Sequence, residues 1–255
     1  GAPATALHVD QSAVVGAADG SLDKPFRTIQ AALDAATTGA LIVVAAGSYP
    51  EDLVVTKRVE LRGVCPEQVE IVGQGGASED AALWLRAPVT VSGFAIRGPS
   101  HGVYAQGYSV ELHHLWIHDA GDVGVGIEQT RATDPSSVHD VLVEHADIGL
   151  ALTAGAPTLE RIEVRDAQAS GAFLRFGPGY VVGGTATFRR ALFDRNKAPS
   201  ILAESMALVM EARKTRPGSA WEVPARWHSP IVQSAVLLAH GKDNPAALGF
   251  LAYLR

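Results

Sequence analysis

One pattern recurs five times between residues 89 and 204, and it constrains the fold more than any other feature. Each copy contains an alternating strand, a polar turn, and a glycine or small residue that opens a second apolar strand. The apolar residues that anchor the copies are Ile96, Ile117, Val143, Val164 and Phe193. They are separated by 21, 26, 21 and 29 residues, which suits one coil of a wide β-solenoid. The longer steps are expected to hold loops at 126–137 and 177–184.

Residues 19–56 are expected to begin the stack, with a helix that leads into a buried strand. The apolar face of the helix is formed by Phe26, Ile29, Ala32, Leu33 and Ala36, at helical spacing. We expect Gly39 to close the helix as a left-handed cap. Residues 41–46 are apolar on both faces, as in a strand buried in a parallel stack. Residues 7–10 alternate well enough to pair with that strand as a short first strand.

Several further segments are short, alternate in polarity and end at Gly, Pro or Asn/Asp residues. They are residues 53–55, 58–63, 69–73, 82–85 and 89–98. Strands this short favour the coils of a solenoid over a sandwich. Leucine-rich repeats have a similar period, but their Leu-x-x-Leu-x-Leu spacing with an asparagine is absent, so a β-helix fits better.

The opening FRTIQAALDAATTGALIVVAAGSYPEDLVV, together with the repeat that follows, resembles the right-handed parallel β-helix, or pectin-lyase-like, family over about residues 19–215. The resemblance implies an all-β, right-handed parallel β-helix with an N-terminal capping helix. It also implies a secreted or cell-envelope protein. Function does not follow from the resemblance, because the family holds lyases, hydrolases, esterases, epimerases, phage tailspikes and adhesins.

The repeat stops after residue 217, so we expect two parts, residues 1–217 and 218–255. In the second part, HSPIVQSAVLLAHGKDNPAALGFLAYLR (228–255) predicts a strand, a turn and a helix. This segment resembles the C-terminal end of periplasmic molybdate-binding proteins. Because an open solenoid end exposes strand edges and apolar core, the segment is expected to act as a C-terminal strand-helix cap. A recombined tail of foreign origin is the alternative.

Composition excludes several classes of protein. The formal net charge is -6, with 21 Lys and Arg against 27 Asp and Glu and no basic run, so nucleic acid is not an expected partner. The longest apolar runs fall far short of the roughly 20 residues that span a bilayer. Gly1 follows no basic or apolar leader, so no signal peptide is recognised. Cys65 is the single cysteine, so no internal disulfide is expected, and the oligomeric state stays open.

Two outward columns of mixed charge are expected where the coils stack. The first column follows the anchors and contains Arg97, His118, Glu144, Arg165 and Asp194. The second contains Gly98, Asp119, His145, Asp166 and Arg195. Mixed signs along a column avoid like-charge repulsion, so a solvated or saccharide-binding face is the expected role. The columns also lie where the family's active sites are found.

A catalytic interpretation would use three residues of these columns. Asp119 and Asp166 are the candidate carboxylates, and Arg165 is the candidate cation or base, for chemistry on an acidic polysaccharide. Against this, the paired-aspartate and Gly-His-Gly signatures of polygalacturonase-like members are missing. The Gln and Asp motifs of pectin methylesterases are missing as well, which argues against both activities.

The candidate binding residues are Trp116, His118 and Glu144 on the stack, with Glu128 and Arg131 on the long loop that would wall a groove. Trp84, Tyr104 and Tyr108 could likewise stack on sugar rings, although packing within or beside the coils is the favoured role of Trp84 and Tyr104. His114 and His118 are four residues apart, but the segment alternates as a strand, so the geometry of a helical zinc site is lost. Neither a metal nor another cofactor is expected.

Three functions remain open from the sequence. The favoured one is an extracytoplasmic, carbohydrate-interacting β-helix that binds or has a structural role and is not catalytic. The alternative is a polysaccharide lyase or hydrolase that acts on an acidic glycan. A third is a recombined or artificial β-helix without an evolved ligand, which the foreign-looking tail and the missing catalytic signatures both allow.

Overall fold

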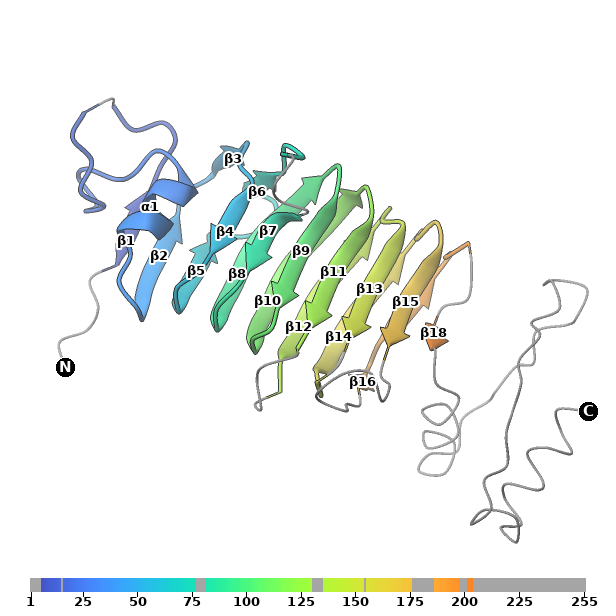
Figure 1. Ribbon diagram of the computed structural model, residues 1–255. Coiled ribbons are helices and arrows are strands. Elements are labelled where there is room, and N and C mark those ends of the chain that lie inside the picture. Colours follow the sequence, from blue (N-terminus) through green and yellow to red (C-terminus); the bar gives the residue numbers. More distant parts are fainter. Residues whose placement is uncertain are drawn as a thin grey trace, which may run out of the picture. The chain divides into compact units, whose positions relative to one another are not determined.

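The computed structural model describes residues 6–14, 16–76, 81–129, 135–153, 155–175, 186–197 and 201–203. These residues form a parallel β-helix with one helix, and the strand pairs between neighbouring coils are all parallel (Figure 1). The predicted all-β parallel β-helix is therefore confirmed. Within the part of the chain that the structure describes, no helix has the length and apolar character needed to cross a membrane.

The coils build two sheets. Sheet A has eleven strands: β1 (Leu7–Val9), β2 (Ala40–Val44), β3 (Gly47–Tyr49), β5 (Val59–Gly63), β6 (Val69–Val72), β8 (Val89–Gly98), β10 (Val110–Ala120), β12 (Ser137–Glu144), β14 (Thr158–Arg165), β16 (Thr187–Arg189) and β17 (Leu192–Asp194). Sheet B has seven strands: β4 (Leu53–Val55), β7 (Ala81–Leu85), β9 (His101–Gln106), β11 (Val123–Glu128), β13 (Ile148–Thr153), β15 (Ser170–Arg175) and β18 (Ile201–Ala203).

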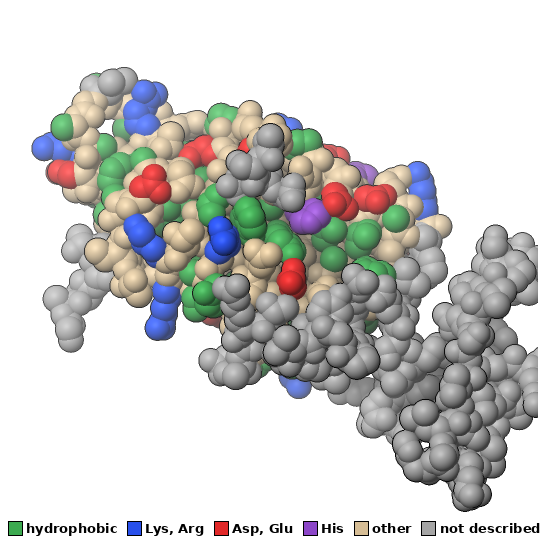
Figure 2. Space-filling model, in the orientation of Figure 1, with side chains coloured by type: hydrophobic (Ala, Val, Ile, Leu, Met, Phe, Trp, Pro, Cys, Tyr) green, Lys and Arg blue, Asp and Glu red, His purple; other side chains and the backbone are tan. Residues whose placement is uncertain are grey.

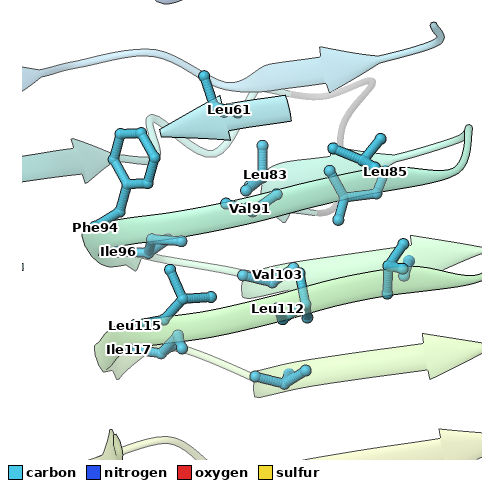
Figure 3. Packing of buried hydrophobic residues seen from close by; sticks show 14 of the residues in the cluster. Leu61, Leu83, Leu85, Val91, Phe94, Ile96, Val103, Leu112, Leu115 and Ile117 are labelled. Atoms are coloured by element: carbon cyan, nitrogen blue, oxygen red, sulfur yellow. The ribbon is translucent and has the colours of Figure 1, made fainter. Parts of the chain in front are cut away.

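The predicted anchors lie in one line along sheet A. Strand pairing places Ile117 between Ile96 and Val143, and then joins Val143 to Val164 and Val164 to Phe193. The first four anchors are fully buried. Figure 3 shows Ile96 and Ile117 in the same interior as Leu83 and Val103 of sheet B. Burial of one such row from each sheet supplies the hydrophobic core that holds the coils together.

Sheet A bends where polar residues adopt a left-handed backbone. The first column of bends contains His114 (φ 52°), Asp140 (φ 54°), Arg161 (φ 53°) and Arg190 (φ 53°), and a second contains Asp119 (φ 50°), His145 (φ 56°), Asp166 (φ 55°) and Arg195 (φ 50°). Positive φ is uncommon outside glycine, and Asp and His tolerate it better than most residues. Each bend adds one outward residue, so the inward positions of β10 are spaced alternately by two and three residues.

The corner between the two sheets is lined by small residues. Equivalent positions on sheet B hold Ala82, Gly102, Gly124, Gly149 and Gly171. A Cβ atom on Gly149 would lie 2.2 Å from Cγ1 of Val164 and 2.5 Å from the carbonyl oxygen of Gly171. The recurring glycine of the sequence pattern is therefore explained by the close approach of the two sheets at this corner.

Helix α1 (Ile29–Ala35) packs Ile29, Ala32 and Leu33 into the first end of the core. Its N-cap is Thr28, whose side chain accepts a hydrogen bond from the Ala31 amide. The helix ends before Gly39, because Ala36 is the C-cap and has an extended backbone. The predicted glycine cap was wrong: Gly39 (φ 87°) instead lies in the turn that leads into β2.

Two side chains from outside the helix hold its ends. The carboxylate of Glu51 accepts hydrogen bonds from the Ile29 and Gln30 amides, at 2.8 and 2.9 Å. At the other end Lys57 Nζ donates to the carbonyl oxygens of Leu33, Asp34 and Ala36, at 3.2, 2.7 and 3.0 Å. Negative charge at the N-terminus of a helix and positive charge at its C-terminus both interact favourably with the helix dipole.

Residues 218–255 lie outside the described part of the chain, as does Arg131. The C-terminal strand-helix cap and the division at residue 217 stay predictions. Thermal unfolding of the chain after deletion of residues 218–255 tests them. A capping segment predicts a lower unfolding midpoint for the shortened chain, and an unchanged midpoint would contradict that role.

Candidate functional site

The predicted charged columns form at the C-terminal ends of the sheet A strands. The strand register places His118, Glu144, Arg165 and Asp194 on successive coils, as the sequence predicts. Gly98 does not belong to the second column, because Ala120 pairs with it and the register shifts between Ile117 and Ala120. β10 therefore has one residue more than β8 at this point, and the second column starts at Asp119.

His118 connects β10 with Glu70 of β6, which lies on the far side of β8 in sheet A. Its Nδ1 atom lies 2.8 Å from the Asp119 carboxylate, and its Nε2 atom lies 3.3 Å from Oε1 of Glu70, at an ion-pair distance without hydrogen-bond geometry. Arg97 Nε donates to the same Glu70 oxygen at 3.1 Å. The indole of Trp116 stacks on the imidazole with ring centroids 4.3 Å apart, so His118 is held on three sides.

Glu144 and Arg165 continue the network on the next two coils. Trp116 Nε1 donates to Glu144 at 2.9 Å, and Arg165 Nη1 donates to the other Glu144 oxygen at 3.4 Å. Arg165 Nε donates to Glu163 at 2.6 Å, and this hydrogen bond raises the pKa of the Arg165 guanidinium. Arg165 is therefore a cation that two carboxylates already bind.

The second column is paired in the same way. His145 Nδ1 lies 3.6 Å from Oδ1 of Asp119. Arg195 donates two hydrogen bonds to the Asp166 carboxylate, from Nε at 3.1 Å and from Nη2 at 2.9 Å. These bonds lower the pKa of Asp166 below its ordinary value. A carboxylate with a lowered pKa is a poor general acid. Asp119 lies two coils away from Asp166, with His145 on the coil between them.

A histidine cluster lies at the first bend of sheet A. The rings of His113 and His139 stack in parallel with centroids 4.9 Å apart, and His114 Nδ1 lies 2.8 Å from His113 Nδ1. Burial, helped by the two neighbouring imidazoles, lowers the pKa of His113. Two hydrogen bonds from Arg161 lower the pKa of Asp140 on the next coils. Among the described residues, no group of three potential ligands is arranged to hold a metal ion.

The outward face of sheet B has a different character. Its central column is formed by Val54, Trp84, Tyr104, Gly126, Ala151 and Phe173, which pair in register on successive coils. We call these six residues the sheet B strip. Figure 2 shows hydrophobic side chains gathered over the middle of this face, with acidic, basic and histidine side chains around them. Gly126 leaves room for the Tyr104 ring, because a Cβ atom there would lie 2.7 Å from that ring.

Polar groups border the strip on both sides. The Tyr104 hydroxyl donates to Glu128, and the guanidinium of Arg86 lies 5.1 Å from the centre of the Trp84 ring. On the other side the His101 ring lies 5.3 Å from that of Tyr104, and its Nδ1 atom lies 3.2 Å from Asp122. Trp84, Tyr104, His101 and Glu128 are all partly exposed, so an aromatic surface with hydrogen-bonding edges faces solvent.

The sequence favoured packing roles for Trp84 and Tyr104 and placed the expected site on sheet A. The available signal was the alternation in ALWLR and GVYAQ, which turns Trp84 and Tyr104 outward. The small residue at the equivalent position of the next coils was visible too, in VGVGIE and IGLALT. Of the predicted binding residues, Glu128 belongs to the sheet B face, and Trp116, His118 and Glu144 belong to the sheet A network.

Comparison with known proteins gives partial likenesses. No family model matches the chain. The molybdate-binding protein ModA of Azotobacter vinelandii is 43% identical over 51 residues, which is 20% of this chain and 20% of that protein. The chain therefore spans about a fifth of the curated relative that it matches, in agreement with the predicted resemblance of residues 228–255.

Two solved structures are similar to the chain over most of its length. A mutant pectin methylesterase in complex with a hexasaccharide aligns with 80% of this chain and 94% of its own, at a TM-score of 0.46 and 10% identity. A second pectin methylesterase complex with a hexasaccharide covers the same shares, at a TM-score of 0.44 and 12% identity. Because both TM-scores are low, the fold assignment rests on the strand pairing described above.

Proposed function

We propose that this β-helix binds carbohydrate through the sheet B strip and does not catalyse a reaction on it. The observation that carries the proposal is the outward pair Trp84 and Tyr104 on adjacent coils, followed in the same column by the small residues Gly126 and Ala151. A sugar ring has an apolar face of C–H groups, which buries area against such a surface, and a rim of hydroxyls, which needs hydrogen-bond partners. Glu128 and His101 stand where that rim would lie.

The sheet A network supports a role without catalysis. An acid or base must be free to exchange a proton with substrate, and a cation for a developing carbanion must face it. Asp119 is hydrogen-bonded to His118, and Arg165 and Asp166 are each paired with an oppositely charged side chain. Such pairing suits a column that stacks coils without like-charge repulsion.

The partner of this strip would be a polysaccharide met outside the cytoplasm, at the cell envelope or after secretion. An aromatic surface on a sheet suits an extended chain, because successive sugars can lie on successive coils, about 4.8 Å apart. The proposal needs no cofactor.

A panel of neutral and acidic oligosaccharides tests the proposal, with isothermal titration calorimetry on any ligand found. The double variant Trp84→Ala/Tyr104→Ala is expected to weaken binding at least about tenfold, as the loss of aromatic stacking area implies. Trp116→Ala is the matched control, because Trp116 is also outward but belongs to the sheet A network.

Three outcomes contradict the proposal. If Trp116→Ala abolishes binding and the double variant does not, the site lies on sheet A. If oligosaccharides in the panel are cleaved, the chain is an enzyme. If the chain binds no oligosaccharide at all, the alternative of a β-helix without an evolved ligand is favoured.

A further inference from the structure

A groove of about 770 Å³ lies at the N-terminal ends of β5, β8, β10 and β12. Both charged columns lie elsewhere on sheet A. Its polar lining comes from Arg58, Glu60, Thr90, Ser109, Glu111 and Ser137. Among the residues that the structure describes, neither the sheet B strip nor a predicted site residue lines it. The groove is therefore a feature that the proposed function does not use.

The groove repeats with the coils. β5, β8 and β10 each contribute a buried valine at the base, and Val59 pairs with Val89, which pairs with Val110. The next residue of each strand, and of β12, points outward as one in-register column of Glu60, Thr90, Glu111 and Ser137. Thr90 Oγ1 donates to Glu111 at 3.3 Å, which ties two coils of the column together. A ligand that makes the same contact on each coil must itself repeat about every 4.8 Å.

The chemistry of the lining selects the class of ligand. Carboxylates accept hydrogen bonds only, whereas the Thr and Ser hydroxyls both donate and accept, so the column suits a ligand rich in hydroxyls. The described part of the lining has two carboxylates, Glu111 and Glu60, of which Glu60 already pairs with Arg62, against one guanidinium, Arg58. It thus lacks the surplus of positive charge that an acidic glycan would need. The described lining residues include no aromatic side chain, so hydrogen bonds must supply most of the specificity.

We infer that this groove is a second saccharide site, which binds an unbranched, neutral oligosaccharide along the axis of the stack. Sugar rings of an extended chain would follow the coils, with hydroxyls directed at Glu60, Thr90 and Glu111 and with Arg58 donating at one end. The inference takes its ligand class from the proposed function but uses different residues, so the two can fail separately.

The test is calorimetry with the neutral oligosaccharides of the panel, on the full chain. The wild type is expected to bind two molecules per chain. Thr90→Lys, which fills the groove and pairs its cation with Glu60 and Glu111, is expected to weaken one of the two sites at least about tenfold. Thr90→Val, which keeps the size but removes the hydroxyl, is expected to weaken that site by a smaller factor. Thr187→Lys is the matched control, because Thr187 extends the same column outside the groove.

The outcomes separate the two sites. If Thr90→Lys binds like the wild type while Trp84→Ala/Tyr104→Ala loses all binding, the groove proposal is wrong and the proposed function stands. If the Trp84 and Tyr104 variant keeps a site that Thr90→Lys loses, the groove is supported. A wild type that binds only acidic oligosaccharides also overturns the groove. Circular dichroism of each variant checks that the β-helix is intact, and Thr90→Val serves if Thr90→Lys fails to fold.

Discussion

The outward faces of the two sheets are built by the same coils but use opposite chemistry. On sheet A, the charged columns place charged residues of successive coils next to one another, and several of them pair with a partner of opposite sign, as in Asp166–Arg195 and Glu144–Arg165. On sheet B the strip has aromatic and small apolar residues, and its polar groups lie at the edges. Both faces are columns in register, so stacking alone does not explain the difference.

The difference indicates which face already satisfies its polar and charged groups within the protein. A paired column satisfies its charges within the protein and has little left to offer a ligand. An exposed apolar column gains nothing from solvent and stays available for burial by a partner. This contrast favours sheet B for binding and sheet A for holding the coils in register.

The largest effect on stability is expected at the corner glycine Gly149, because the two sheets pack closely against each other there. Gly149→Ala would drive a Cβ atom into Val164 of sheet A and into the backbone of Gly171. We expect a loss of about 3 kcal/mol in the free energy of unfolding, measured by urea denaturation. Gly16→Ala is the control, because the nearest atom to a Cβ there is 4.0 Å away. Equal stability of both variants would show that the sheets separate easily.

A smaller loss is expected at the chain segment that links sheet B to sheet A before β5. Lys57→Met removes the ammonium group that binds three carbonyl oxygens at the end of helix α1. We expect a loss of about 2 kcal/mol in unfolding free energy, typical of hydrogen bonds to a charged group. The exposed Lys24→Met is the control, and a similar loss in both variants would argue against a specific clamp.

A charge placed on each face in turn sharpens the comparison for binding. Ala151→Glu puts a carboxylate into the sheet B strip, and we expect at least about tenfold weaker saccharide binding with little change in stability. Leu142→Glu is the matched variant, because Leu142 is a partly exposed, outward residue of sheet A beside Trp116. We expect it to bind like the wild type. Equal losses in the two variants would remove the distinction between the faces.

The smallest effect is expected from single ion pairs of sheet A, and it depends on pH. Arg195 lowers the pKa of Asp166 in the folded chain, so the pair stabilises the fold above the ordinary aspartate pKa of about 4. That contribution is lost as the pH falls through the lowered pKa. Arg195→Gln should therefore be slightly less stable than the wild type at pH 7 and equally stable in strong acid. Urea unfolding over this pH range measures it, and a pH-independent difference would contradict the ion pair.

Much of the fold could be predicted, because alternation and period are local properties of the chain. The anchors from Ile96 to Phe193 fall in one line, and the strands at 53–55 and 89–98 have their predicted bounds. The first charged column followed from the same register. Sequence position sets which way a strand residue points, so columns can be derived once the coil length is known.

Other features could not be predicted, because they depend on how coils meet in space. The extra residue at Asp119 displaces Gly98 from the second column, and only the strand register reveals it. Left-handed bends at His114 and Asp140 keep the inward positions aligned, although no glycine marks them. The groove at Thr90 exists because four coils present the same edge side by side.

The sequence by itself determined a parallel β-helix, the helix that precedes its first long strand and the residues that face its core, because burial of a repeated apolar pattern leaves few other solutions. Only the tertiary structure decided which outward residues are neutralised by their neighbours and which face solvent. Charge pairing and exposure depend on distances between coils, over separations of 20 residues or more, which no local pattern encodes. For this reason the candidate site moved from the charged columns of sheet A to the aromatic strip of sheet B.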